Sequence, residues 1–133
     1  MTPDKLKKNF SRCPDWEEKY LYLIELGDRF ATLDEAFHTE EYLVPGCQSQ
    51  VWVTLSVEDE KIVLNASSDA AIVRGLLALL VIAFDGQPLS DARAFDLKGW
   101  FAELDLESHL TPTRTMGLNA IVNHVKALTD QHS

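Results

Sequence analysis

The sequence lacks the motifs that mark metal and cofactor sites. It has only two cysteines, and its four histidines show no CxxC, HxH or HExxH spacing. We interpret each histidine as a surface residue rather than a metal ligand. GxGxxG, GxxxxGK[ST] and GxSxG sequences are also absent, so dinucleotide, P-loop and serine-hydrolase chemistry have no support. We therefore expect neither a metal nor a cofactor.

Basic residues and long apolar runs are scarce as well. Twelve Lys and Arg stand against 21 Asp and Glu, a net charge of −9, which disfavours nucleic-acid binding. The most apolar stretch, residues 72–84, is interrupted by Arg74 and is too short to cross a membrane. No apolar segment follows the first lysines, so we predict no signal peptide. These features predict a cytoplasmic protein with reduced thiols and no membrane or nucleic-acid partner.

Periodicity and capping residues predict helices on either side of a β-hairpin. Residues 51–57 alternate and are rich in β-branched side chains, 58–60 form a charged turn, and 61–66 form the partner strand. Two strands alone make a marginal sheet, so we expect a third strand at 42–44. Gly27 is predicted to end the second helix, and Ser68 to cap a helix that starts at Asp69. Other predicted caps are Thr2, Asp15, Ser90, Asp96 and Thr111.

The predicted fold class is α+β, with a small antiparallel sheet of about three strands packed by helices. No internal repeat, low-complexity tract or linker interrupts the sequence. At 133 residues the chain is the length of one domain, which we place at residues 1–133.

Cys47 is the candidate for chemistry. Pro45 and Gly46 form a turn just before it, and the loop feeds directly into the strand at Val51. A glycine neighbour lets a partner approach the thiol closely. A buried, inert cysteine fits this position equally well on physical grounds alone. For Cys13, between Arg12 and Pro14 at a helix end, the structural interpretation is preferred.

The surroundings of Cys47 favour sulfur exchange over hydrolysis. No histidine or lysine lies close in sequence to act as a base, and no helix begins directly after Cys47. A cysteine hydrolase needs its own base and an oxyanion hole. A sulfur acceptor needs only a thiol that attacks the outer sulfur of a persulfide, and its partner can supply the activation.

Apolar residues flank Cys47 and are expected to shield it. Burial among them would raise the pKa of the thiol and slow its reactions until a partner docks. The flanking residues are Leu43, Val44, Pro45, Val51 and Trp52.

Four stretches resemble the SufE family, in the family's order and across nearly the whole chain. The stretch around the thiol, GCQSQVW at 46–52, is similar to the signature of the family's sulfur-accepting cysteine. The other three are WEEKYLYLIELG at 16–27, SDAAIVRGLLA at 68–78 and HLTPTRTMGLNA at 109–120.

The resemblance implies a SufE/IscU-like fold and a role in iron–sulfur cluster assembly. It implies that Cys47 accepts sulfur from a PLP-dependent cysteine desulfurase of the SufS type and delivers it to the SufBCD complex. The PLP belongs to the desulfurase, so the chain is a covalent carrier and desulfurase activator rather than an independent enzyme. Asp69 and Arg114 match positions tied to donor contact and the active-cysteine region. Gly46 and Gln48 would support the active loop.

Two of these matched positions also have simpler explanations. Asp69, expected in the first turn of a helix, is favourable to the helix dipole whatever else it does. Arg114 stands near a helix start, where the dipole disfavours a cation, so we expect it to be paired or used.

Several alternatives stay open at this point. A CsdE-like carrier would serve another desulfurase and acceptor, although Gln48-Ser49-Gln50 is more similar to the SufE branch. An IscU-type scaffold needs about three thiolates plus a further ligand, which two cysteines do not supply. A thiol redox enzyme would use Cys13 to resolve Cys47, and an adaptor would bind a desulfurase without using Cys47. Self-association into a homodimer is also left open.

Overall fold

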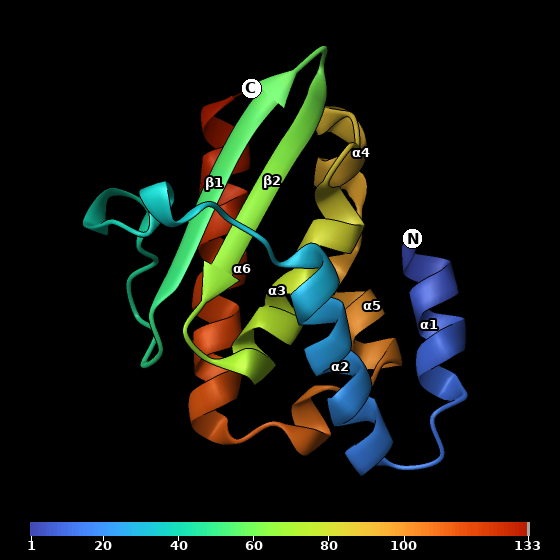
Figure 1. Ribbon diagram of the computed structural model, residues 1–133. Helices are drawn as coiled ribbons and strands as arrows, with labels where there is room; N and C mark the ends of the chain where they lie inside the picture. Colours follow the sequence, from blue (N-terminus) through green and yellow to red (C-terminus); the bar gives the residue numbers. More distant parts are fainter. Residues whose placement is uncertain (133) are drawn as a thin grey trace.

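The chain is built on a β-hairpin and the apolar helix that follows it. The computed structural model describes residues 1–132; Ser133, the last residue of the predicted domain, lies outside the described residues. The elements in order are α1 (Pro3–Ser11), α2 (Trp16–Phe30), the 3-10 helices η1 (Glu35–Phe37) and η2 (Glu40–Tyr42), β1 (Val51–Glu58), β2 (Lys61–Ser68), α3 (Ala71–Phe84), α4 (Leu89–Ala94), α5 (Leu97–Glu103), η3 (Glu107–His109) and α6 (Pro112–Gln131). This arrangement confirms the α+β class (Figure 1).

The hairpin is tightly closed and carries two strands rather than three. Asp59 and Glu60 form its turn with positive φ angles of 51° and 67°, as two-residue hairpin loops require. The predicted third strand at 42–44 is wrong within residues 1–132, because that segment makes only one isolated bridge, Leu43 to Trp52. Its continuation is blocked by the 3-10 turn of η2 before it and by Pro45, which has no N–H, after it.

Helix α3 forms the centre of the core because it is apolar on nearly every face. It packs against α2 on one side and against β2 on another. The approach to α2 depends on two glycines: a Cβ on Gly27 would lie 2.7 Å from the backbone nitrogen of Gly75. The prediction that Gly27 ends α2 is wrong, since the helix continues through it to Phe30. Gly27 instead marks the point where α2 packs closely against α3.

Most predicted helix starts are confirmed, and two are not. The side chains of Thr2, Asp15, Asp96 and Thr111 each accept a hydrogen bond from a first-turn N–H of their helix. The predicted caps of α3 and α4 are wrong. Helix α3 begins at Ala71 with Ala70 at its N-cap, and Ser90 lies inside α4, which starts at Leu89 after Pro88.

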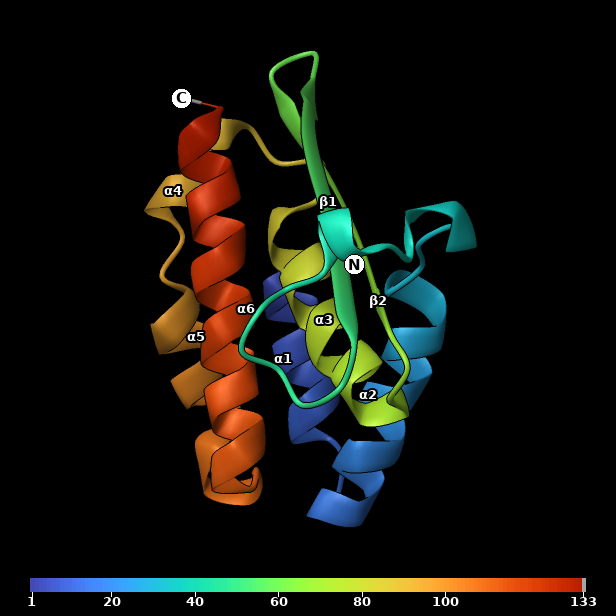
Figure 2. The same cartoon turned by 90° about the vertical axis from the view of Figure 1, so that its left-hand side faces the viewer.

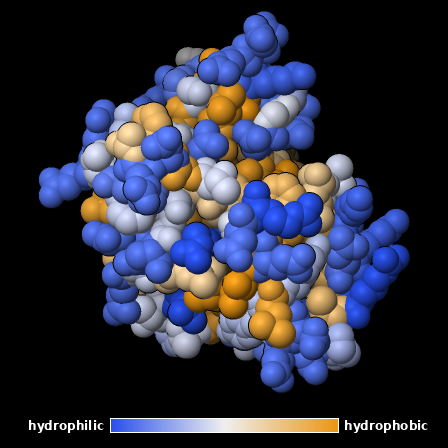
Figure 3. Space-filling model, in the orientation of Figure 1, coloured by the Kyte–Doolittle hydropathy of each residue, from blue (hydrophilic) through white to orange (hydrophobic). Residues whose placement is uncertain are grey.

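The helices lie around the hairpin in two groups. Helices α4, α5 and α6 lie on one side of the hairpin, α2 and η1 lie on the other, and η2 crosses in front of β1 (Figure 2). The face seen in Figure 1 is mostly hydrophilic, and apolar residues reach it only in small separate patches (Figure 3). No helix within residues 1–132 is both long and apolar enough to cross a membrane.

Candidate functional site

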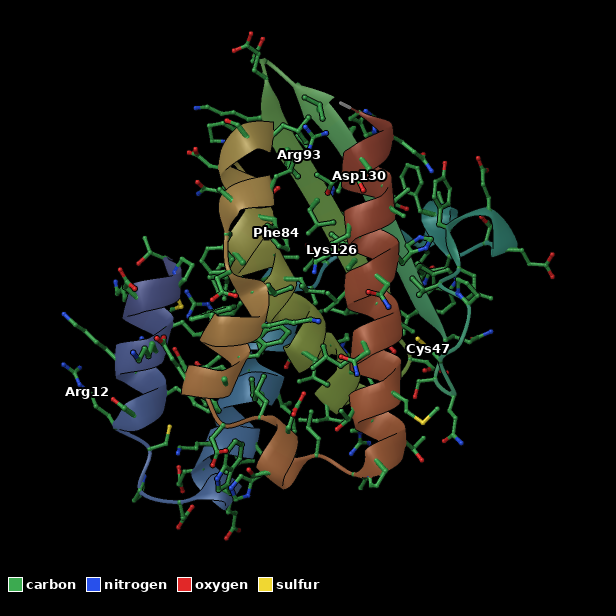
Figure 4. All side chains as sticks on the ribbon, turned by 180° about the vertical axis from the view of Figure 1, so that it is seen from behind. Arg12, Cys47, Phe84, Arg93, Lys126 and Asp130 are labelled. Carbon is green, nitrogen blue, oxygen red and sulfur yellow. The ribbon has the colours of Figure 1, made fainter. Side chains whose placement is uncertain are left out.

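Cys47 lies in the loop that precedes β1, beside α6 (Figure 4). Its side chain is half-buried, and its Sγ donates a weak hydrogen bond to the carbonyl oxygen of Gly117 over 3.8 Å. Gly117 belongs to α6, 70 residues further along the chain. The thiol is therefore held against a helix that is remote in sequence.

Gly46 sets the backbone that turns Cys47 toward α6. Its φ angle is +86°, in the region that side chains rarely adopt. Space does not require the glycine, since a Cβ here would meet the Cβ of Ala120 at an ordinary 3.5 Å. Gly46 is needed for its conformation.

The cysteine loop is anchored at both of its ends. At the first end the Val44 N–H donates to the Val51 carbonyl over 2.8 Å. At the second end Gln50 is held by Asp69, whose Oδ1 accepts from the Gln50 N–H over 3.1 Å and whose N–H donates to the Gln50 carbonyl over 3.3 Å. The Ser68 hydroxyl donates to the same carbonyl over 2.6 Å. Residues 45–49 thus form a short loop between two fixed points.

Asp69 has a different position from the one predicted. It precedes α3 instead of lying in its first turn, so the helix-dipole explanation does not apply. Its carboxylate holds the cysteine loop, as described above. Next to it, Arg74 reinforces the junction: its Nη1 donates to the Ser68 carbonyl over 2.9 Å, and its Nη2 lies 3.9 Å from the Asp28 carboxylate.

Cys47 and Arg114 line the same pocket, which has a volume of about 390 Å³. Arg114 comes from the first turn of α6, where its N–H is capped by the Thr111 hydroxyl. In the part of the chain that the structure describes, the Arg114 guanidinium makes no ion pair or hydrogen bond. Gln48 also lines the pocket, whereas Asp69 does not. The structure therefore brings three of the five predicted site residues to one pocket and gives the other two, Gly46 and Asp69, roles in shaping the loop.

Burial raises the pKa of the Cys47 thiol above its ordinary value. At neutral pH the thiol therefore holds its proton more firmly than an exposed cysteine does. The thiolate is the nucleophile in sulfur exchange, so the resting site is slow to react by itself.

Most residues that line the pocket with Cys47 come from helices instead of from its neighbours in sequence. Of the five flanking residues expected to shield the thiol, only Val51 lines the pocket. Trp52 instead stacks on His38, with ring centroids 4.3 Å apart. The helices that line the pocket are α3 and α6, through residues that include Val73, Leu76, Thr113, Gly117, Leu118 and Ile121.

The pocket carries no cluster of metal ligands. Within residues 1–132, no group of three or more His, Cys, Asp or Glu side chains lies close enough together to hold a metal ion. The pocket lining includes one thiol, of Cys47, and one guanidinium, of Arg114.

The sequence matches a family model over almost its whole length. The SufE model, described as an Fe–S metabolism associated domain, matches residues 4–129. This chain belongs to the SufE family. Membership associates the SufE-family chain with iron–sulfur metabolism.

A solved structure supports the fold independently. The SufE-family chain is similar to the solution structure of a hypothetical protein from Thermus thermophilus, with a TM-score of 0.78. The two share 22% sequence identity, and the match covers 98% of this chain and 97% of the other. This likeness establishes the architecture.

Proposed function

We propose that this SufE-family protein is a sulfur carrier that accepts a sulfane sulfur on Cys47 from a PLP-dependent cysteine desulfurase of the SufS type. It stimulates that desulfurase and delivers the sulfur to the SufBCD scaffold for iron–sulfur cluster assembly. The observation that carries the proposal is a half-buried thiol on a short anchored loop, in a pocket that also holds the Arg114 guanidinium.

The transfer is a thiol–persulfide exchange. The Cys47 thiolate attacks the outer sulfur of the donor persulfide, the donor S–S bond breaks, and the donor cysteine leaves as a thiolate. A new S–S bond forms on Cys47, and the proton lost from its thiol is balanced by protonation of the leaving thiolate. No external electron is required at this step. The next acceptor thiol attacks the Cys47 persulfide in the same way.

Arg114 and the anchored loop have complementary roles in this proposal. The guanidinium supplies positive charge for the thiolate or persulfide anion once the loop brings either one to it. The anchors at Val44 and Gln50 restrict motion to residues 45–49, so an outward swing of Cys47 disturbs no helix or strand. Gly46 serves as the hinge.

The thiol redox alternative is disfavoured by the placement of the two cysteines. Arg12, the neighbour of Cys13, lies on the opposite side of the molecule from Cys47 (Figure 4). An internal disulfide would require the two thiols to come within bonding geometry across the core. Sulfur transfer to and from partner proteins needs no such movement.

The test is direct. The protein is incubated with a SufS-type desulfurase and cysteine, and intact mass and peptide mapping are used to find one added sulfur on Cys47. Cys13→Ser is the matched control, because it keeps the proposed acceptor and should gain the same sulfur. Absence of added sulfur on Cys47, or its appearance on Cys13, would contradict the proposal. Parallel incubation with a CsdA-type desulfurase distinguishes the CsdE-like alternative, and transfer from the loaded protein to SufBCD tests the acceptor.

A further inference from the structure

The two outer edges of the β-hairpin differ in how their backbone groups are satisfied. Along the outer edge of β2, the N–H of Ile62 donates to the Gln87 carbonyl over 2.9 Å, and the carbonyl of Ile62 accepts from the Gly86 N–H over 2.8 Å. The Leu64 N–H donates to Oδ1 of Asp85 over 2.9 Å. The segment after α3 therefore closes this edge from Ile62 to the Leu64 N–H.

The outer edge of β1 is closed at its beginning only. The Val51 carbonyl accepts from Val44, so it points away from β2. Because alternate residues of a strand present their backbone groups to the same edge, those of Leu55 and Val57 point outward too. Among residues 1–132, nothing hydrogen-bonds to these outward groups of Leu55 and Val57. Unpaired strand edges of this kind are templates for another strand.

This open edge lies in a groove with a volume of about 1010 Å³. In Figure 2 the edge of β1 faces the viewer, with α6 on one side and η1 on the other, while η2 crosses in front of the middle of the strand and leaves the half toward the hairpin turn uncovered. The walls mix polar side chains with apolar and aromatic ones. Phe37, 40% exposed, is one of the few large hydrophobic side chains left open to solvent. The apolar and aromatic lining residues are Leu33, Phe37, Tyr42, Val53, Leu55, Val63 and Leu128.

The charged side chains that line the groove are all acidic. Its lining includes the carboxylates of Asp34, Glu41 and Glu58, and no lysine or arginine from the described residues. His124 also lines it, and burial lowers the pKa of this histidine, so it is neutral near neutral pH. An occupant that complements the groove carries positive charge.

We propose that this groove binds an extended, basic segment of a partner protein, which adds as a strand alongside β1. Main-chain hydrogen bonds to Leu55 and Val57 would supply affinity, and alternating apolar and basic side chains would meet the walls and the carboxylates. A second copy of this chain is a poor occupant, because pairing two β1 edges brings two sets of groove carboxylates together. The surface is separate from the Cys47 pocket, with which it shares no lining residue.

The experiment uses the full chain and a defined probe. An acetylated and amidated peptide of alternating lysine and valine, KVKVKVKV, is titrated into the protein, with binding followed by calorimetry and amide hydrogen exchange by NMR. We expect binding that weakens as salt is raised. In the free protein the amides of Leu55 and Val57 should exchange quickly, and those of Thr54 and Ser56 slowly. Binding of the peptide should slow the exchange of the Leu55 and Val57 amides.

Two controls separate strand addition from simple charge attraction. The same peptide with alternate backbone nitrogens methylated keeps its charge but cannot complete the ladder, and should bind about tenfold more weakly for the loss of one to two hydrogen bonds. Leu55→Pro removes one outward N–H at an edge position that tolerates proline, whereas Leu55→Val retains it. We expect weak binding for Leu55→Pro and unchanged binding for Leu55→Val. Cys47→Ser should bind like the unaltered chain, so the result is independent of sulfur transfer.

Several results would overturn the proposal. Equal binding of the methylated peptide, or of an acidic EVEVEVEV peptide, would show that strand pairing or charge complementarity is not involved. Failure of KVKVKVKV to bind would contradict the proposed basic occupant. Binding without protection of the Leu55 and Val57 amides would contradict pairing with β1. A dimer in sedimentation with both amides already protected would identify a second copy as the occupant.

Discussion

The two cysteines make a natural comparison because their immediate chemistry is similar. Each is partly buried, and each donates a weak hydrogen bond to a backbone carbonyl: Cys13 to Asn9 over 3.7 Å, and Cys47 to Gly117 over 3.8 Å. Burial is the largest cause that raises the pKa of both thiols. Neither thiol is activated at rest.

They differ in what the rest of the fold does around them. The carbonyl partner of Cys13 is four residues away in the last turn of α1, which ends just before Cys13, so that contact is local. The partner of Cys47 is in α6, and the thiol shares a pocket with Arg114. A functional cysteine is therefore distinguished here by its long-range setting more than by its resting pKa.

The largest expected difference between the two thiols is in sulfur acceptance. Cys47→Ser should abolish stimulation of the desulfurase, because a hydroxyl cannot replace the thiolate in sulfane transfer. Cys13→Ser should retain most of it. Desulfurase turnover with each variant is the measurement, and circular dichroism checks that both remain folded. An inactive Cys13→Ser beside an active Cys47→Ser would reverse the assignment.

The next effect concerns the turn before Cys47. Gly46→Ala should destabilise the protein by about 1 kcal/mol, because alanine is strained at a φ of +86°. It should also slow sulfur acceptance, since the strained loop leaves its pocket geometry. Gly86→Ala is the matched control, with a φ of +77° and open space around a Cβ, but remote from the pocket. If both variants lose stability and neither loses activity, Gly46 has no special role.

Removing the second anchor of the loop should have a comparable effect on stability. Asp69→Ala deletes the acceptor of the Gln50 N–H, at a cost of about 1 kcal/mol. We expect altered desulfurase affinity and faster alkylation of Cys47, because the loop is freed at one end. Asp96→Ala removes a helix cap of similar energy, about 1 kcal/mol, away from the loop. Equal rates of Cys47 alkylation in Asp69→Ala and Asp96→Ala would show that Asp69 contributes to stability but does not control access to Cys47.

The smallest effect is on pH dependence. Since burial raises the pKa of Cys47, its alkylation should reach half-maximal rate at a higher pH than that of an exposed thiol. Addition of a desulfurase inactivated at its own cysteine should increase the rate. The raised pKa also means that the free energy of unfolding falls as pH rises through the thiol range, and Cys47→Ser should lessen that fall. Rates that do not change when the desulfurase is added would exclude gating by the partner.

Local signals in the sequence were reliable wherever a local interaction decides the outcome. Thr2, Asp15, Asp96 and Thr111 cap helices because an N-cap depends on atoms three residues away. The hairpin followed from alternation and a charged turn. Cys47 and Arg114 were found through their resemblance to a family, and chain geometry alone left Cys47 ambiguous.

The sequence by itself determined the order of helices and strands and most of the residues that cap them. Only the tertiary structure decided three further points. Gly27 is a helix crossing instead of a stop, because Gly75 from α3 lies against it. Asp69 anchors the cysteine loop instead of stabilising a helix dipole, because β2 ends beside Gln50. The pocket of Cys47 is lined by α3 and α6, because packing brings together residues that no sequence spacing relates.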